Sequence, residues 1–319
     1  MVSEARDKRE GARVDMGKMI QISEVSKQYK NERVVSGATM TVTRGEIYGF
    51  LGPNGAGKTT IMKMLLNLVK PTSGEIRINN HQILGQSSTY LKKIGSLIET
   101  PVFYTKLTAR ENLFLHGEYM GGASSERVDE VLEIVHLAEV ADKLVTEYSL
   151  GMKQRLGIAR AILMKPEILI LDEPINGLDP IGIKEVRELL LMLKNKYGMT
   201  VLISSHIVSE IEWIADTIGV INQGKVLQEV KLSEIREVNN AYLAVEVSDV
   251  NKALVVLEQD QTIEKIQIDT NQLIYLHGNE LDQSDITKQL ILADVAVHRI
   301  EKQQKTLEEY FLSIISGGK

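Results

Sequence analysis

Two short segments of the sequence carry the residue types that bind phosphate and activate water. The first is the run Gly52-Pro53-Asn54-Gly55-Ala56-Gly57-Lys58-Thr59-Thr60, which has the spacing of a P-loop. Glycines let the backbone wrap around phosphate oxygens, which the backbone N–H groups and the following helix N-terminus then bind. We expect the whole run to contact a nucleotide, with Lys58 on the outer phosphates and the Thr59 hydroxyl on Mg²⁺.

The second segment is a pair of acids, Asp172 and Glu173, that follows the apolar run Ile168–Leu171. Ligands bind at the carboxyl ends of strands in open α/β sheets, so Asp172 is placed to reach Mg²⁺ directly or through water. Adjacent residues of a strand face opposite ways. This predicts that Glu173 points elsewhere and is the general base for attack of water on the γ-phosphate. A pair of solvated acids at a strand end is the alternative, which the P-loop upstream disfavours.

This chemistry needs a sheet whose strand ends meet at one edge, and the apolar pattern predicts such a sheet. Alternation and short apolar runs predict strands at 20–22, 39–42, 47–51, 168–171, 200–204, 218–221 and 226–230. Amphipathic spacing predicts helices at 58–69, 153–164, 183–197 and 208–213, and a mostly helical segment over 109–143. Buried strands that alternate with helices favour an α/β fold with a parallel sheet covered on both faces.

The pattern changes after Lys231 and predicts a small separate α+β domain. It indicates strands near 243–247, 263–268, 273–276 and 295–300, and helices near 252–257, 286–292 and 307–315. The order strand-helix-strand-strand-helix-strand favours a ferredoxin-like arrangement. We therefore predict domains at 19–230 and 231–319, preceded by a charge-mixed, disordered tail at 1–18.

Composition excludes several classes of function. The chain has 319 residues, 37 basic and 43 acidic side chains and a net charge of −6, which argues against a nucleic-acid partner. It has no cysteine, so disulfide scaffolds, thiolate metal sites and cysteine nucleophiles are impossible. No apolar run approaches the ~20 residues of a membrane span, and the N-terminus lacks the apolar region of a secretory signal. We expect a cytoplasmic protein that reaches a membrane only through a partner.

Four further landmarks narrow the class of P-loop protein. They are Tyr29, the segment Ser149-Leu150-Gly151-Met152, Asp179 in Asn176-Gly177-Leu178-Asp179, and His206 in Ser204-Ser205-His206. Taken alone, Ser149 is typical of a helix N-cap. Taken in order with the P-loop and the two acids, the landmarks resemble the ATPase subunits of ABC transporters over about Met19 to Val230. The usual central Ser-Gly-Gly-Gln of that family's signature motif is Ser-Leu-Gly-Met here.

The resemblance implies a fold and a nucleotide site. The fold is a RecA-like α/β core with an antiparallel β-subdomain and a helical subdomain at about 100–160. Tyr29 would stack on adenine. Two copies would face head to tail, with each ATP between the P-loop of one copy and Ser149 and Gly151 of the other, and with Asp179 in the adjoining D-loop.

The resemblance also implies a reaction and a partner. ATP hydrolysis would use Glu173 to activate water and His206 to position the γ-phosphate. A membrane permease would carry the cargo and hold this chain at the cytoplasmic face of the membrane as a peripheral subunit. The loop near Glu99 and the helical segment after it would receive the coupling helix of that permease.

Glu99 stands where most members of the family carry a glutamine. The carboxylate keeps an oxygen that can approach Mg²⁺ or water, and it adds a negative charge. A solvated loop glutamate is the alternative. With the segments 108–113, 149–156, 177–183 and 307–311, Glu99 resembles the ATP-binding subunits that protect bacteria from bacitracin and lantibiotics. This resemblance implies that Glu99 acts in catalysis and in metal binding, together with Thr59 and Asp172.

These resemblances predict the ATPase subunit of a bacterial exporter that confers resistance to bacitracin or a related peptide antibiotic. An exporter of another drug or lipid, a non-transport ABC ATPase and a regulatory nucleotide binder remain as alternatives. Non-transport members usually carry two cassettes or a long coiled coil, which this sequence lacks, and Glu173 and His206 argue against a purely regulatory role. The sequence does not reveal the cargo, because cargo contacts belong to the permease.

Overall fold

The structure is a computed structural model that describes residues 17–83, 88–238, 242–269, 272–278, 281–303 and 307–315. Contacts divide the chain into two units, Met1–Lys231 and Leu232–Lys319. Most of the predicted tail, residues 1–16, lies outside the described residues. Lys18 is the first residue of a strand and pairs with Thr43, one residue before the predicted start of ordered sequence at Met19.

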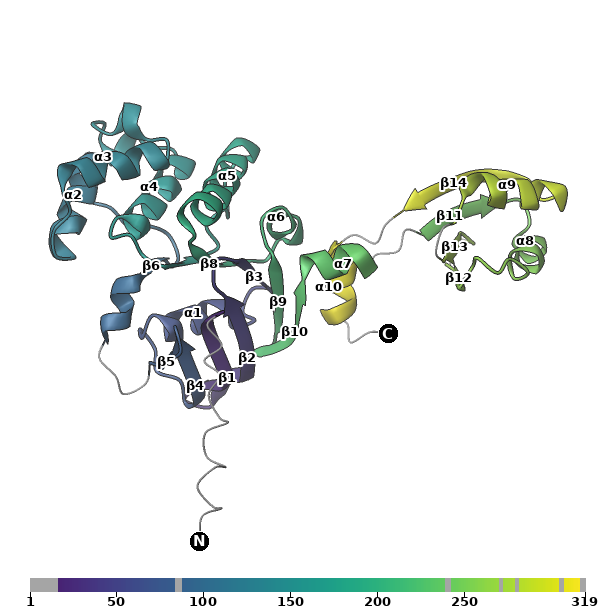
Figure 1. Cartoon of the computed structure of the whole chain (residues 1–319), viewed down its shortest axis with the longest axis horizontal. Helices are drawn as coiled ribbons and strands as arrows, with labels where there is room; N and C mark the ends of the chain where they lie inside the picture. The colour runs from purple at the N-terminus through teal and green to yellow at the C-terminus, as the bar shows by residue number, and fades with distance from the viewer. Residues whose placement is uncertain are drawn as a thin grey trace, which may run out of the picture. The chain divides into compact units, whose positions relative to one another are not determined.

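A mainly parallel sheet forms the centre of the first unit (Figure 1). Its strands are β3 (Ile47–Leu51), β6 (Ile94–Leu97), β7 (Ile168–Asp172), β8 (Thr200–Ser205), β9 (Thr217–Asn222) and β10 (Lys225–Lys231), in the order β10-β9-β3-β8-β7-β6. Only β10 runs antiparallel to its neighbour among these strands. Every residue of β3, β7 and β8 is buried, which confirms the predicted parallel sheet with both faces covered.

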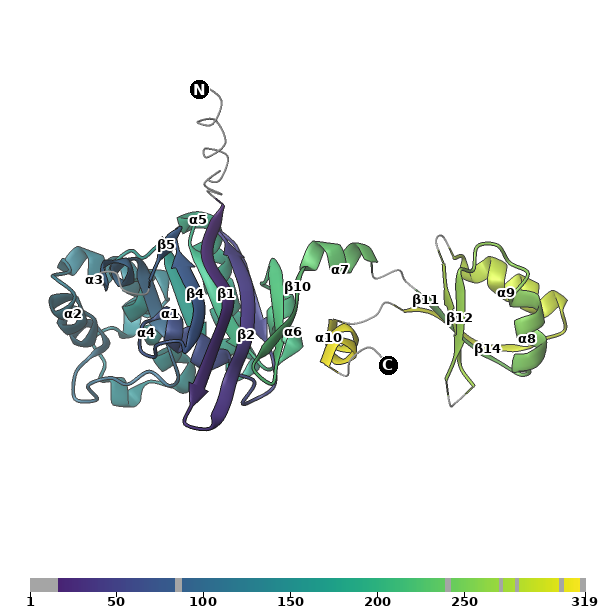
Figure 2. The same cartoon turned by 90° about the horizontal axis from the view of Figure 1, so that it is seen from below.

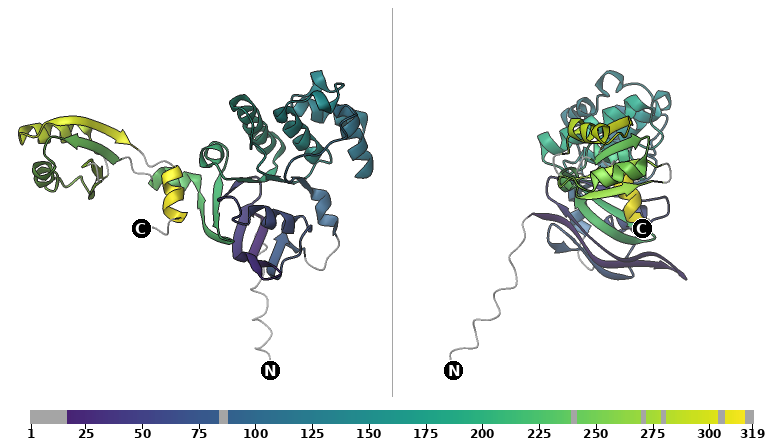
Figure 3. Two further views of the ribbon diagram at one scale, coloured as in Figure 1. Left: turned by 180° about the vertical axis from the view of Figure 1, so that it is seen from behind. Right: turned by 90° about the vertical axis from the view of Figure 1, so that its right-hand side faces the viewer.

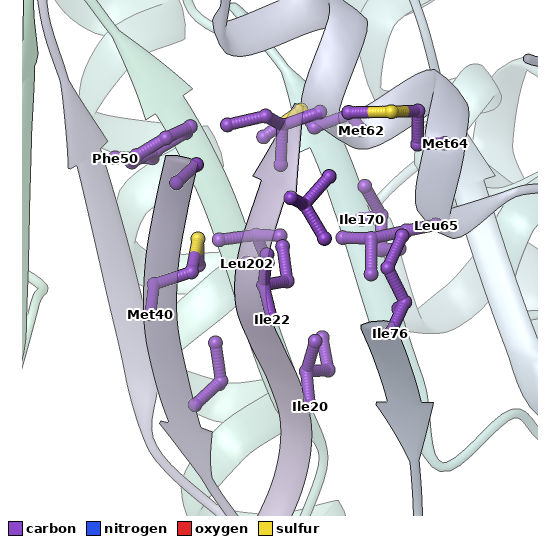
Figure 4. Packing of buried hydrophobic residues seen from close by; sticks show 14 of the residues in the cluster. Ile20, Ile22, Met40, Phe50, Met62, Met64, Leu65, Ile76, Ile170 and Leu202 are labelled. Atoms are coloured by element: carbon purple, nitrogen blue, oxygen red, sulfur yellow. The ribbon is translucent and has the colours of Figure 1, made fainter. Parts of the chain in front are cut away.

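An antiparallel sheet covers one face of the central sheet, with a helix packed between them. The strands are β1 (Lys18–Tyr29), β2 (Glu32–Thr43), β4 (Ser73–Ile78) and β5 (His81–Gln82), and the helix is α1 (Lys58–Leu65). Figure 4 shows apolar side chains of both sheets and of α1 meeting in one core: Ile20, Ile22, Met40, Phe50, Met62, Met64, Leu65, Ile76, Ile170 and Leu202. This packing fixes α1, and with it the P-loop, against the end of β3.

Helices lie on the other face of the central sheet (Figure 3). They are α4 (Leu150–Ile162), α5 (Pro180–Tyr197) and α6 (Val208–Glu212), and α2 (Ala109–Tyr119) and α3 (Ser125–Ile134) group with α4. Two helices begin three residues before their predicted starts. Side-chain caps explain both, because Ser149 caps α4 and Asp179 caps α5, whose first residue is a proline. Helix α1 ends at Leu65 and not at the predicted Val69.

The second unit contains an antiparallel sheet with the helices α8 (Val250–Leu257) and α9 (Gln283–Leu292) on one side (Figure 2). Its elements are α7 (Leu232–Val238), β11 (Tyr242–Val247), α8 (Val250–Leu257), β12 (Lys265–Ile268), β13 (Ile274–His277), α9 (Gln283–Leu292), β14 (Val297–Gln303) and α10 (Leu307–Ile315). The strand order β12-β13-β11-β14 confirms the predicted ferredoxin-like arrangement. Side chains such as Leu243, Val245, Ala253, Ile274 and Leu290 form its core. Among the described residues, no helix of either unit has both the length and the apolar character of a membrane span.

Candidate functional site

The P-loop connects the end of β3 to the start of α1. Gly55 and Gly57 have φ angles of +80° and +108°, in the left-handed region that residues with a Cβ rarely adopt. A Cβ on Gly52 would overlap the carbonyl oxygen of Ile221 on β9. Gly57 is also the N-cap of α1 and has no side chain to cover the first N–H groups of the helix. The spacing of the glycines is therefore required by this backbone path, which leaves the helix N-terminus open to an anion.

Lys58 is buried beneath the P-loop, and oxygen atoms surround its ammonium group. Its Nζ donates hydrogen bonds to the carbonyl oxygens of Gly52, at 2.6 Å, and of Pro53, at 3.3 Å. The same atom lies 3.2 Å from Oε1 of Glu173. A buried ammonium group needs such partners, because an unpaired buried charge is costly. The pairing also brings Glu173 to the P-loop.

Asp172 is buried at the end of β7, and two hydroxyl groups fix its carboxylate. Thr59 Oγ1 donates to Oδ2 at 2.7 Å, and Ser204 Oγ donates to Oδ1 at 2.6 Å. The Thr59 hydroxyl and the Asp172 carboxylate therefore lie together at the start of α1. Mg²⁺ prefers oxygen ligands and is usually bound by one or two protein groups together with substrate phosphates. These two side chains fit that donor set.

Within the described residues, no group of three or more His, Asp or Glu side chains is arranged to hold a metal ion. A metal bound by Thr59 and Asp172 would therefore need further oxygen ligands. Phosphate oxygens of a nucleotide in the P-loop meet that need. The donor set thus fits a metal that arrives with a nucleotide.

Glu173 contacts His206 as well as Lys58. Nδ1 of His206 lies 2.6 Å from Oε2 of Glu173, so these two side chains from the ends of neighbouring strands form one cluster. The prediction that strand alternation turns Glu173 away from Asp172 is wrong. Strand β7 ends at Asp172, and Glu173 has a φ of +50° in the left-handed region. Both acids therefore turn towards the P-loop, Asp172 to Thr59 and Glu173 to Lys58.

A cavity of about 200 Å³ lies over these groups. Val34, Asn54, Gly55, Ala56, Gly57, Lys58, Thr59, Thr60 and Glu173 line it. The P-loop residues and Glu173 both line it, so a phosphate chain in this cavity would contact both. Tyr29, at the end of β1, is 43% exposed and is not among the lining residues. The Nζ atom of Lys27 lies 4.8 Å from the centre of the Tyr29 ring.

Ser149, Gly151 and Asp179 lie at the starts of two other helices. Ser149 Oγ accepts a hydrogen bond from the N–H of Met152 at 3.2 Å, and Asp179 Oδ1 accepts one from the N–H of Gly182 at 3.0 Å. A Cβ on Gly151 would lie 3.9 Å from Cα of Gly182, so the N-termini of α4 and α5 lie close together. No hydrogen bond or ion pair in the described part of the chain joins these three residues to the P-loop cluster.

Glu99 lies in the loop that follows β6, with a φ of +61°. Its carboxylate is 66% exposed and lies 2.7 Å from Nζ of Lys63 on α1. The hydrogen bond from Lys63 lowers the pKa of the Glu99 carboxyl, and the same bond raises the pKa of Lys63. Glu99 thus contacts the P-loop helix one turn beyond Thr59, and its hydrogen-bond partner is Lys63.

Three residues of the site were not predicted from the sequence. Ser204 joins the two acids, because its Oγ donates to Asp172 and accepts the Glu173 N–H at 2.9 Å. Lys63 binds Glu99. Glu210 is a buried carboxylate on α6 that accepts a hydrogen bond from Ser205 Oγ at 3.2 Å, and burial raises its pKa. Ser204 lies near the end of the strand that pairs with β7, so it could have been found only from the order of the strands in the sheet.

Comparison with known proteins agrees with this geometry. The ABC transporter family matches residues 35–176. The chain is 50% identical over 299 residues to YcbN, an uncharacterised ABC transporter ATP-binding protein of Bacillus subtilis, covering 94% of this chain and 97% of that protein. It is 44% identical over 303 residues to BcrA, the bacitracin transport ATP-binding protein of Bacillus licheniformis, covering 95% and 99%.

A solved structure agrees with the fold of the first unit. It is a dimeric ATP-binding cassette in a post-hydrolysis state with bound ADP and phosphate, 28% identical to this chain. The TM-score is 0.61, and the match covers 67% of this chain and 99% of the cassette. With a P-loop, two acids and a histidine gathered at one edge of the sheet, and with relatives over nearly the whole length, this chain belongs to the ABC transporter ATP-binding proteins, whose cassette hydrolyses ATP to drive transport.

Proposed function

We propose that the chain is the ATP-hydrolysing subunit of a bacterial exporter that confers resistance to bacitracin or a related peptide antibiotic. The observation that carries this proposal is the extent of the similarity to the bacitracin transport protein. It includes the second unit as well as the cassette, because it covers 95% of the chain. Glu99 supports it, since this carboxylate marks the subgroup in the sequence and lies against the P-loop helix.

The P-loop residues bind the phosphates of ATP in this proposal. The backbone from Gly52 to Thr60 surrounds the phosphate chain, and Lys58 contacts the outer phosphates. Thr59 and Asp172 hold Mg²⁺, with Glu99 as a further oxygen donor within reach of α1. The metal supplies charge neutralisation for the phosphate oxygens. Tyr29 stacks on the adenine from the end of β1.

Glu173 and His206 carry out the hydrolysis step in the same proposal. Glu173 accepts a proton from the attacking water, and its contact with Lys58 supports this role, because Lys58 is the proposed partner of the outer phosphates. His206 is held by Glu173 at 2.6 Å and positions the γ-phosphate. The products are ADP and phosphate, and the proton that Glu173 takes from water returns to solvent.

A second copy of the chain completes each site. Ser149, Gly151 and Asp179 lie at the starts of α4 and α5, apart from the P-loop cluster of their own chain. Helix N-termini bind anions, so the start of α4 with Ser149 and Gly151 suits the γ-phosphate of an ATP held by the partner copy, with Asp179 in the adjoining loop. The two copies then close head to tail over two ATP molecules.

The cargo path belongs to a membrane permease in this proposal. Its support is the family, whose members are ATP-binding subunits of transporters, and among the described residues no helix has the length and apolar character of a membrane span. The permease holds the chain at the cytoplasmic face of the membrane. Its coupling helix contacts the loop near Glu99 and the helices α2 and α3 that follow it.

Deletion of the encoding gene tests the cargo. We expect the deletion strain to become more sensitive to bacitracin, and wild-type protein expressed in trans to restore resistance. Glu173→Gln should fail to restore it, and Glu188→Gln, which changes an exposed carboxylate on α5, should restore it fully. Sensitivity to lantibiotics but not bacitracin would reassign the peptide. Unchanged sensitivity to every peptide antibiotic tested would overturn the proposed role in resistance.

A further inference from the structure

We propose that Lys63 is a positioning residue for Glu99, holding its carboxylate on the P-loop helix and balancing the extra charge that a glutamate brings there. This inference rests on the proposed metal and nucleotide site. It adds to that site a residue that does not touch the phosphates itself. The partners are the Nζ atom of Lys63 and the Oε1 atom of Glu99, 2.7 Å apart.

The position of Lys63 on α1 makes this contact specific to the site. Lys63 follows Thr59 by four residues, so the two side chains share one face of the helix. A helix rises about 1.5 Å per residue, which places Lys63 roughly 6 Å further along the axis. Lys63 therefore holds the Glu99 carboxylate one turn away from the hydroxyl that contacts Asp172.

The charges around Lys63 show why a cation is needed at this place. Glu99 bonds it directly, and Asp172 adds to the negative potential at its Nζ atom. With a neutral glutamine at position 99, the triphosphate would have one negatively charged neighbour fewer. A glutamate adds like charge to a region that already contains Asp172 and, on binding, the phosphates. Lys63 offsets that charge, so the substitution of carboxylate for carboxamide is tolerated.

The pair is also weak enough to exchange partners. Both side chains are partly exposed, at 33% for Lys63 and 66% for Glu99. Exposed ion pairs contribute little stability, because water solvates and salt screens both charges. Glu99 can therefore leave Lys63 when a metal and a nucleotide arrive. The left-handed backbone at Glu99, two residues beyond β6, directs the side chain towards α1 in the first place.

The coupling between the two residues is measurable with Mn²⁺ in place of Mg²⁺. The experiment uses the full chain with a non-hydrolysable ATP analogue, and reads free Mn²⁺ by electron paramagnetic resonance. Four proteins are compared: wild type, Lys63→Met, Glu99→Gln and the double variant. Without Lys63, the Glu99 carboxylate is no longer held one turn away from Thr59 and its charge is no longer offset. We therefore expect Lys63→Met to tighten Mn²⁺ binding about fivefold in the wild-type background and less than about twofold in the Glu99→Gln background.

Two controls make the result specific. Lys184→Met removes a more exposed lysine, at 67% against 33% for Lys63, from an ion pair on α5 and should leave the Mn²⁺ affinity unchanged. Lys63→Arg keeps the charge and should behave like wild type. Equal effects of Lys63→Met in both backgrounds would overturn the inference, because Lys63 would then act only as a distant charge. Failure of the wild-type chain to bind the ATP analogue would instead overturn the proposed nucleotide site.

Discussion

At the scale of single residues, Lys58 and Glu173 explain how the site is ready for a phosphate. Two backbone carbonyls and the Glu173 carboxylate orient the Lys58 ammonium group. Nδ1 of His206 contacts the other carboxylate oxygen of Glu173, Oε2. Charged groups that are already oriented stabilise a transition state without the cost of reorganisation. In the proposed function, this cluster would combine phosphate binding and base catalysis in contacts between three side chains.

Glu173→Gln should separate binding from hydrolysis. The amide cannot accept a proton from water, so we expect the hydrolysis rate to fall about 10²- to 10⁴-fold. ATP affinity should stay close to wild type, because Lys58 keeps its bonds to the two P-loop carbonyls. Steady-state phosphate release and equilibrium nucleotide binding measure the two quantities. Turnover at the wild-type rate would show that another group is the base, and Glu188→Gln serves as the exposed control.

Glu210 should make folding stability depend on pH. Burial raises the pKa of its carboxyl above the ordinary value of 4.5, against the effect of the Ser205 hydrogen bond. The other charged groups that act on it are His206 and Arg187, which lower its pKa, and Glu173, which raises it. As pH rises above 4.5, the unfolded chain loses this proton first, so ionisation favours the unfolded state.

Glu210→Gln removes that titration and keeps an oxygen that can accept from Ser205. The variant should therefore gain stability relative to wild type as pH rises from below 4.5 to neutral. Urea unfolding at a series of pH values measures this difference. A constant difference across the series would contradict the assignment. The exposed Glu188→Gln variant should show no such trend.

At the scale of elements, the strand β6 is positioned by close contact with α4. Gly95 allows this contact, because a Cβ at this position would overlap the carbonyl oxygen of Ala161. Strand β6 leads into the loop of Glu99, and Ser149 caps the first turn of α4. The close packing that Gly95 permits thus fixes the strand before the Glu99 loop against the helix that begins at the signature motif.

Gly95→Ala should destabilise the first unit. Forcing an extra methyl group into a packed contact typically costs about 1–3 kcal/mol, and here the obstacle is backbone and not a flexible side chain. The midpoint of urea unfolding should fall accordingly. Ser96→Ala, at the next position of the same strand, is the matched control and should change the midpoint little. An unchanged midpoint for Gly95→Ala would mean that β6 and α4 can move apart freely.

The sequence predicted those parts of the elements and site that depend on local pattern. The P-loop, the two acids and the fully buried strands β3, β7 and β8 each lie in one continuous segment, so spacing alone identifies them, whereas β4 and β6 were missed. The helix starts at Leu150 and Pro180 were missed because their caps, Ser149 and Asp179, outweigh the amphipathic pattern. Ser204 was missed because its contact with Asp172 arises from the pairing of β7 with β8, which no local pattern contains.

At the scale of the whole molecule, each unit has a hydrophobic core of its own. Apolar residues of both sheets and α1 form the first core, and residues of β11, β13, α8 and α9 form the second. A core of its own is what allows a domain to unfold as a separate cooperative unit. The similarity to the bacitracin transport protein extends over both units. The second unit is thus shared with that relative and is not an irregular tail.

Calorimetry should therefore show two unfolding transitions in the intact chain, of which ATP shifts only one. The test uses the Glu173→Gln protein, so that ATP persists during the scan. At a ligand concentration of about 100 times the Kd, binding stabilises the folded cassette by about 2.7 kcal/mol. For a domain of this size, that raises the Tm by roughly 5–10 °C.

The second transition should stay in place, because the P-loop, Asp172 and Glu173 all belong to the first unit. Truncation after Lys231 should remove this transition and leave the response of the first one to ATP. If both transitions moved together with ATP, or merged into one, the two cores would unfold as a single cooperative unit. Residues 232–319 would then contribute directly to the stability of the nucleotide-bound cassette, and truncation would lower its Tm.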